Sequence, residues 1–318
     1  MSGNTRGNSD LLILAEEWQQ ELDEILWSDL LQLQFYRRVG FPKAKEFVTH
    51  SIGVPELHNY QEEGIYTYDA VDQGETRIVV NDPVYAANSF TRLLQEDSDQ
   101  IAQVVAAIPG LHANTIKEGI ITDILALANH QSAGTGNNNT LNGAKHRFVA
   151  TGTSQKMKVE DFAYAAAALR MAKVPTTNLV AIVHPSVGYT MDTLTNIANV
   201  SNNPRWEGVI ATGLQNQMRF IKNIYGFDIY ESTMLPSAVN ETIDTVSSGA
   251  YGVANVFFSM ANPALLPFLY AEKRAPLLET DFDFDHDNTL KIRTSARWGT
   301  GLVRDENLVT ILSNGQLG

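Results

Sequence analysis

The stretch SFTRLLQEDSDQIAQVVAAIPGLHANTIKEGIITDILALAN, residues 89–129, carries a helical pattern of apolar residues with one interruption. Proline removes a backbone donor and disfavours helix at the residue before it, so we expect Pro109 to bend or break the element. The sequence therefore predicts a long, interrupted helical element whose second segment covers 114–129. The apolar positions that define the pattern are Phe90, Leu93, Leu94, Ile101, Val104, Val105, Ile108, Ile116, Ile120, Ile121, Ile124, Leu125 and Leu127.

A second helical pattern lies near the N-terminus. Ser9 is suited to an N-cap, and Arg37 and Arg38 are suited to a helix C-terminus, so we expect an amphipathic helix over residues 9–38. Its apolar stripe is too wide to face water alone. The helix therefore either docks on another molecule or packs on its own domain.

The region between these helical patterns is rich in strand signals separated by Gly and Pro. Alternating residues favour a half-exposed ribbon, and a two-stranded ribbon is marginally stable alone in water. We expect it to gain stability on a neighbouring molecule. The predicted strands cover 47–52, 65–71 and 76–81.

The rest of the chain begins with a loop over 131–143 and then alternates helix and strand. The loop is rich in Gly and Asn but lacks the Gly-Lys-Ser/Thr ending of a phosphate-binding loop. After it, the pattern predicts an α/β module and then a strand-rich final third. The expected helices are 158–172 and 189–197, and the expected strands are 178–183, 226–230, 253–259, 277–285, 288–299 and 307–313.

The composition is that of a globular protein. Of 318 residues, 44% are hydrophobic and 19% are charged, and no apolar run is long enough for a membrane helix. The chain has no cysteine, which excludes disulfides, zinc–thiolate sites and a thiol nucleophile. The net charge of −13 argues against tight wrapping of nucleic acid. No signal peptide is evident, so we expect synthesis in the cytoplasm.

One run of acidic residues could hold a metal. Asp281, Asp283, Asp285 and Asp287 would share one face of a strand, while Phe282, Phe284 and His286 would share the other. The run lacks the glycine and terminal glutamate of a calcium loop. We interpret it as a solvated strand face that ends in a hairpin, and we assign no metal ligand.

Two further groups could carry other functions. His184 and Ser186 follow a predicted strand, but there is no Gly-x-Ser-x-Gly elbow, and Pro185 is expected simply to end the strand. The second group, after a loop, has too few charges for a nucleic-acid groove and suits a surface or subunit contact. Its members are Arg205, Trp206, Arg219 and Lys222. We assign no catalytic residue and no cofactor-binding residue.

The order of these elements resembles that of the major capsid proteins of tailed phages, the HK-97-like fold that encapsulin shells also use. Three passages carry the resemblance: Leu179–Pro185 (LVAIVHP), Phe227–Pro236 (FDIYESTMLP) and Trp298–Glu306 (WGTGLVRDE). Each is weak alone, but their order matches the family. The implied fold class is α+β, with an N-terminal arm, an extended β-hairpin loop, a long spine helix with a peripheral β-sheet, and an axial α/β domain.

The resemblance also implies a division of the chain into five parts. They are an N-terminal arm (1–42), an extended β-hairpin loop (43–88), a peripheral domain with the spine helix (89–147), an axial domain (148–240) and a return through strands of both domains (241–318).

The function implied by the resemblance is that of a major capsid protein rather than an enzyme. Copies of the chain would form pentamers and hexamers of an icosahedral shell, without cofactors or a membrane, and enclose double-stranded DNA without reading its sequence. The implied partners are a scaffolding protein, a portal and decoration proteins. The shell would be assembled in the host cytoplasm and form part of the virion. The alternatives are an encapsulin-type compartment and a soluble α/β hydrolase that uses His184, Ser186 and an aspartate.

The chain departs from some members of the family in two respects. No lysine lies between Glu46 and Asp82, so cross-linking through a lysine of the extended loop is not supported. Only about forty residues precede that loop, which is too few for the long helical prefix that serves other members as a built-in scaffold. A separate scaffolding protein is therefore implied.

Overall fold

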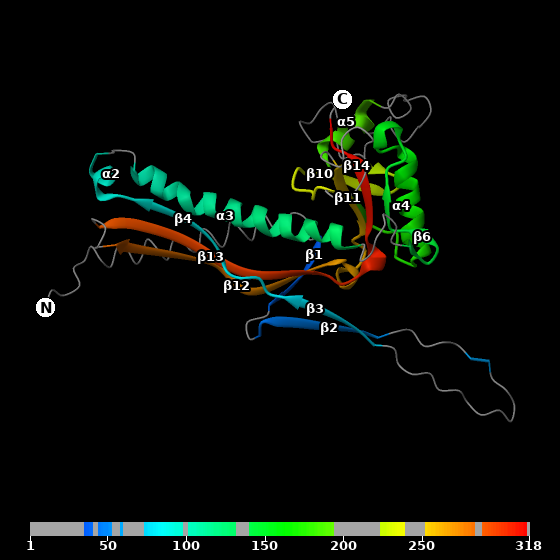
Figure 1. Ribbon diagram of the computed structural model, residues 1–318, viewed down its shortest axis with the longest axis horizontal. Helices are drawn as coiled ribbons and strands as arrows, with labels where there is room; N and C mark the ends of the chain where they lie inside the picture. The colour runs from blue at the N-terminus through cyan, green and yellow to red at the C-terminus, as the bar shows by residue number, and fades with distance from the viewer. Residues whose placement is uncertain are drawn as a thin grey trace.

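The computed structural model describes residues 35–40, 44–52, 58–59, 73–97, 101–131, 140–193, 223–238, 252–283 and 288–316. Figure 1 shows an elongated arrangement in which one long helix lies along a long sheet. A mixed α/β part stands at one end of this arm, and a β-hairpin projects from near the same end. None of the described helices has the length and apolar character needed to cross a membrane.

The long arm is a four-stranded sheet covered by helix α3. The strand order is β1-β12-β13-β4, with β1 parallel to β12 and the other pairs antiparallel. The helix buries residues at spacings of three and four against the sheet, as its sequence pattern predicts. The elements are β1 (Tyr36–Gly40), β4 (Val84–Phe90), α2 (Arg92–Asp97), α3 (Ile101–Ala126), the 3-10 helix η1 (Leu127–Gln131), β12 (Phe268–Asp283) and β13 (Thr289–Leu302).

Helix α3 is continuous through Pro109, so a break at this proline is wrong, whereas a bend there stays a prediction. Pro109 leaves the carbonyl of Val105 without its helical donor, at a cost of about 3 kcal/mol. Ile108 and Ala113, on either side, are buried against β12 and β13. Packing of this face therefore offsets the lost hydrogen bond. The predicted helix start is also wrong, because Ser89 and Phe90 belong to strand β4.

The prediction of helix up to Arg38 is wrong as well, because residues 36–40 form strand β1. This strand pairs with β12 from Tyr36–Phe268 to Gly40–Glu272. Phe35 packs edge-on against Phe268, with ring centroids 6.3 Å apart. Pairing with a distant segment thus overrides the local helical pattern. Most of the helix predicted over 9–38 lies outside the described residues.

The α/β part is built on a six-stranded sheet of order β7-β14-β11-β8-β10-β9. The predicted helix at 158–172 and the strands at 178–183, 226–230, 253–259 and 307–313 are confirmed within two residues at each end. The elements are β5 (Thr140–Leu141), β6 (Ala144–Lys145), β7 (Arg147–Val149), the 3-10 helix η2 (Thr153–Gln155), α4 (Val159–Met171), β8 (Leu179–Val183), α5 (Pro185–Thr193), β9 (Asn223–Ile224), β10 (Phe227–Glu231), β11 (Gly252–Ser259), the 3-10 helix η7 (Asp305–Asn307) and β14 (Val309–Asn314).

Several further boundaries differ from the sequence prediction. Helix α5 begins at Pro185 rather than Tyr189, because proline suits the first turn of a helix, where its missing N–H is not needed. The end of the predicted 131–143 loop forms a small hairpin, β5–β6, with a turn at Asn142 and Gly143 in the left-handed region. Strand β12 begins at Phe268, nine residues before the predicted start, and has irregular register on both sides of Arg274.

The two faces of the α/β sheet enter two different cores. On strand β8, Leu179, Ala181 and Val183 pack against α4 and α5, while Val180 and Ile182 pack toward α3 and the long sheet. All five residues are buried, as the apolar run predicts for a strand covered on both faces. The second core therefore joins the α/β part to the long arm.

Candidate functional site

A β-hairpin projects from the body of the molecule (Figure 1). It consists of β2 (Glu46–Ile52) and β3 (Gln73–Val79), paired antiparallel from Glu46–Val79 to Ile52–Gln73. This confirms the strands predicted at 47–52 and 76–81, whereas the one predicted at 65–71 lies outside the described residues. Val48 and Val79 of the hairpin are exposed, at 36% and 52% of their surface. The hairpin thus presents apolar side chains to water.

The base of the hairpin is attached to the long sheet by backbone hydrogen bonds. The N–H of Val80 donates to the carbonyl oxygen of Lys45 at 3.0 Å, and the N–H of Asn81 donates to that of Trp298 at 3.0 Å. The Nε of Arg297 also donates to the carbonyl oxygen of Asn81 at 2.8 Å. The orientation of the hairpin is therefore set where it meets β13.

Two glycines of β13 form a slot for the hairpin base. A Cβ on Gly301 would overlap the side chain of Ile78, and a Cβ on Gly299 would lie 2.8 Å from the carbonyl oxygen of Val79. Ile78 is 2% exposed and packs with Leu269 in this slot. Sequence reasoning missed the glycine slot. The signal was the pair of glycines inside a strand, which marks a close approach of another segment.

Helix α3 is attached to the sheet by buried polar contacts. The ring of His112 lies between Thr294 and Asn88, with Nδ1 3.0 Å from Thr294 Oγ1 and Nε2 2.7 Å from Asn88 Oδ1. Burial lowers the pKa of His112. Farther along the helix, Trp298 Nε1 donates to Asp123 Oδ2 at 2.9 Å. These contacts add directional constraints to the apolar packing of α3.

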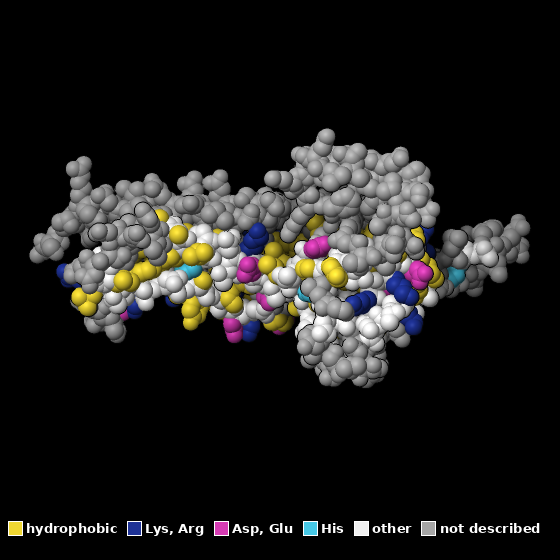
Figure 2. All heavy atoms as spheres, turned by 90° about the horizontal axis from the view of Figure 1, so that it is seen from above, with side chains coloured by type: hydrophobic (Ala, Val, Ile, Leu, Met, Phe, Trp, Pro, Cys, Tyr) yellow, Lys and Arg dark blue, Asp and Glu magenta, His cyan; other side chains and the backbone are white. Residues whose placement is uncertain are grey.

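Exposed apolar side chains gather near the end of the long arm that carries α2. Figure 2 shows hydrophobic atoms on the surface toward this end, on the left of the view. Strand β4 is an edge strand of the described sheet. Exposed apolar groups beside a free edge mark an interaction surface. The exposed apolar residues of α2 and α3, which we call the distal patch, are Leu93, Leu94 and Leu111. Val84 and Tyr85 of β4 are also exposed, but they lie at the other end of that strand, paired with Ala296 and Ser295.

The acidic run contains only two described aspartates. Asp281 is exposed and pairs in register with Lys291, while Asp283 forms an ion pair with the same lysine. Asp285, His286 and Asp287 lie outside the described residues, as does Phe284. Across the described residues, no group of three or more potential ligands is placed to hold a metal.

His184 and Ser186 are in contact at the start of α5. His184 Nδ1 lies 2.9 Å from Ser186 Oγ, and the backbone N–H of Ser186 donates to the same nitrogen at 3.3 Å. Burial lowers the pKa of His184. Asn255 Oδ1 accepts from the backbone N–H of His184 at 2.9 Å. The histidine ring therefore acts as a local cap for the first turn of α5.

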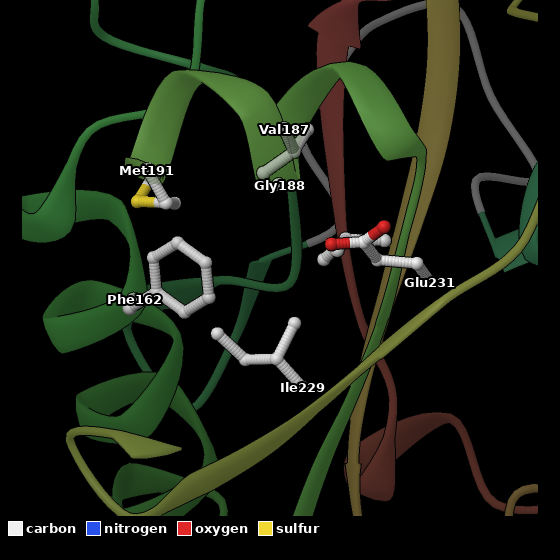
Figure 3. Close-up of a pocket in the computed structure, with 7 residues that line it drawn as sticks. Phe162, Val187, Gly188, Met191, Ile229 and Glu231 are labelled. Atoms are coloured by element: carbon white, nitrogen blue, oxygen red, sulfur yellow. The ribbon is translucent and has the colours of Figure 1, made fainter. Parts of the chain in front are cut away.

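The cavity beneath α5 is very small. Its volume is about 10 Å³, room for about one water, whereas ligand pockets usually measure about 300–1,000 Å³. Figure 3 shows Glu231 directed toward Gly188, with Phe162, Met191 and Ile229 completing an apolar lining. A Cβ on Gly188 would overlap the Glu231 carboxylate. This cavity does not fit a substrate.

The remaining candidate group lies outside the described residues. It comprises Arg205, Trp206, Arg219 and Lys222.

Comparison with known proteins identifies the family. A family model described as phage capsid protein matches residues 86–311, well over half of the chain. The chain belongs to the phage capsid protein family. It is a structural protein, a major capsid protein that assembles with itself into the head shell of the virion. No curated protein matches significantly.

Several solved phage capsids share the fold of this capsid protein. The mature capsid of bacteriophage PhiM1 aligns with a TM-score of 0.63 and 12% identity over 89% of this chain and 86% of that chain. The capsid of Helicobacter pylori bacteriophage KHP30 aligns with a TM-score of 0.60 and 10% identity, over 89% of this chain and 88% of that chain. The capsid of cyanophage P-SCSP1u aligns with a TM-score of 0.58 and 13% identity, over 89% of this chain and 87% of that chain. The fold is the α+β, HK-97-like fold that the family resemblance implies.

Proposed function

We propose that this capsid protein builds the icosahedral head of a tailed phage from pentamers and hexamers, and that the head encloses double-stranded DNA. The observation that carries the proposal is the projecting hairpin. It is anchored at its base by the glycine slot, while apolar side chains along it face water. A repeated lattice can cover such a segment with identical neighbours.

The proposed division of labour follows the five segments 1–42, 43–88, 89–147, 148–240 and 241–318, as arm, extended loop, peripheral domain, axial domain and return. The topology supports this scheme in one respect. Strands β11 and β14 of the last segment join the α/β sheet, whereas β12 and β13 of the same segment form the centre of the long sheet. The last segment thus contributes to both sheets.

The proposed partners are a separate scaffolding protein, a portal, decoration proteins and DNA bound without sequence preference. The net charge of −13 supports a wall that repels DNA rather than one that binds it tightly. We place assembly in the host cytoplasm, away from membranes. We assign the chain no catalytic, cofactor-binding or metal-binding residue.

Electron microscopy of the purified protein, with and without the scaffolding protein from the same genome, tests the proposal. We expect closed icosahedral particles, and nuclease-protected double-stranded DNA in mature heads. Particles that carry enzyme cargo and no DNA would favour an encapsulin-type compartment. A chain that stays monomeric in both conditions would contradict the proposal.

A further inference from the structure

A pocket of about 140 Å³ lies between the middle of the described hairpin strands and the beginning of β12. Segments distant in sequence converge on it: β1, both strands of the hairpin, the 3-10 helix η5 (Pro263–Leu265) with the residues after it, and residues 303–304 after β13. We call this the basic pocket. Its walls come from the hairpin and from the sheet, so anything bound there touches both.

The pocket combines an apolar wall with hydroxyl groups. Leu266 and Leu269 are buried, at 6% and 3% exposure, and contribute the apolar part of the lining. Thr49 and Thr76 face each other in the register of the hairpin and contribute two hydroxyls, with His50 beside Thr49. Such a lining can hold the aliphatic stem of a side chain and also bind a polar head.

The charge of the pocket lining is positive. Arg37 from β1 and Arg304 from the segment after β13 both contribute to it, and no Asp or Glu does. Within the part of the chain that the structure describes, neither guanidinium forms an ion pair. Among the acidic side chains of the strands that line the pocket, Glu272 pairs with Arg38 and Glu75 pairs with Arg77. Two arginines are thus available for an anion.

We infer that the basic pocket receives the carboxylate of an Asp or Glu side chain from a second copy of the chain. Guanidinium groups bind carboxylates through paired, charge-assisted hydrogen bonds. The chain carries 36 acidic and only 23 basic residues, so a neighbouring copy offers mostly negative charge. A contact between a basic pocket and an acidic copy is electrostatically complementary.

The position of the pocket gives this contact a role in assembly. Because the hairpin and the sheet both line it, a bound carboxylate would bridge them and restrain the angle of the hairpin. DNA phosphate is the less suitable occupant, since the pocket has two arginines and no extended basic groove that would follow a polymer. The inference rests on the assembly of the chain into a shell.

Zero-length cross-linking tests the inference. In Arg304→Lys shells assembled from mixed isotope-labelled and unlabelled chains, carbodiimide treatment should join the introduced lysine to an Asp or Glu of another copy. Mass spectrometry would detect peptide pairs of mixed label. Arg293→Lys is the matched control, because Arg293 Nε donates to Glu279 Oε2 of the same chain at 2.9 Å. That control should give pairs of a single label.

Assembly of the double variant Arg37→Gln/Arg304→Gln provides the second test. We expect at least a tenfold lower yield of closed shells with an unchanged far-ultraviolet circular dichroism spectrum and melting temperature, whereas Arg293→Gln should assemble normally. Normal assembly of the double variant, or the absence of cross-links between copies at position 304, would overturn the inference. The cross-links between copies should form in chloride and be lost when inorganic phosphate replaces chloride at equal ionic strength. That result would support an anion site that a carboxylate occupies.

The wild-type protein in the same assay separates the inference from the proposed function. If wild-type shells form but the basic pocket yields no cross-links between copies, the inference fails and the proposed function stands. If wild-type chains never form shells, the proposed function fails, and the inference falls with it.

Discussion

The α/β part and the projecting hairpin differ in how completely each is covered by its own chain. Strand β8 has five residues in the sheet, and all five are buried between two cores. The hairpin β2–β3 is held at its base, and Val48 and Val79 are exposed along it. The α/β part is thus covered by its own chain, and we call it the self-sufficient part. The hairpin leaves apolar side chains that only other copies can cover.

The largest expected effect on stability lies in the self-sufficient part. Phe257 is fully buried and packs against Phe162 and Phe227, with ring centroids 5.3 Å apart in both pairs. Phe257→Ala should lower the free energy of unfolding by about 3–5 kcal/mol through the cavity it leaves. Urea denaturation of the unassembled subunit would measure this loss.

Tyr189→Ala is the control for that experiment, because Tyr189 on α5 is 56% exposed. We expect it to change stability by less than about 0.5 kcal/mol. Equal losses in the two variants would contradict the view that the α/β part is held by its own core.

The next prediction concerns the attachment of the hairpin. Gly301→Val should force Ile78 out of its slot, costing about 1–3 kcal/mol, and should prevent closed shells because the hairpin then leaves at another angle. Particle yield by gradient sedimentation and stability by denaturation would be measured together.

Gly40→Ala is the matched glycine control, because a Cβ there meets no described atom within 4 Å. It should assemble like the wild type. Normal shells from Gly301→Val would show that the slot does not determine the hairpin orientation.

The sequence predicted the self-sufficient part well and the attachment of the other part poorly. The run LVAIV of β8 and the alanine-rich helix α4 have local patterns that their packing reinforces, so both appear as expected. The helix break at Pro109 was wrongly predicted because burial of the neighbouring residues against β12 overrides the local preference of proline. The helix over residues 36–40 was wrongly predicted because this segment pairs with β12 as a strand. Long-range contacts of this kind leave little local signal.

The basic pocket was beyond sequence reasoning for the same reason. Arg37 looked like the end of a helix, and only the strand β1 places it beside the hairpin and Arg304. The glycine slot had a signal, the pair Gly299 and Gly301, but nothing local identifies Ile78 as its occupant.

A smaller effect is expected from the pH dependence of the long arm. Burial lowers the pKa of His112, so the folded protein binds a proton there less readily than the unfolded chain does. Stability contributed by neutral His112 is therefore present above the unfolded pKa, about 6.5, and is lost as pH falls below it toward the folded pKa.

Comparison of wild type with His112→Gln between pH 7.5 and about 5 would isolate this contribution. We expect the wild type to lose more stability on acidification than the variant, as measured by thermal melting. His146→Gln is a reference for the same effect outside the long arm, because burial also lowers the pKa of His146, which lies in the α/β part. Parallel curves for wild type and His112→Gln would contradict the prediction.

The smallest effect on stability should come from the distal patch. Leu93 and Leu111 are 65% and 62% exposed. The double variant Leu93→Ser/Leu111→Ser should therefore change the free energy of unfolding by less than about 1 kcal/mol. Assembly should nevertheless slow, because lattice contacts would lose apolar surface. Light scattering during assembly would follow the rate, and an unchanged rate would remove this patch from the lattice contacts.

Hydrogen exchange in the free subunit and in the assembled shell tests the central claim most directly. The amides of 46–52 and 73–79 should exchange rapidly in the free subunit and become at least a hundredfold slower in the shell, while those of β8 and β11 stay protected in both. Hairpin amides already as protected as β8 in the free subunit, and unchanged on assembly, would contradict the account.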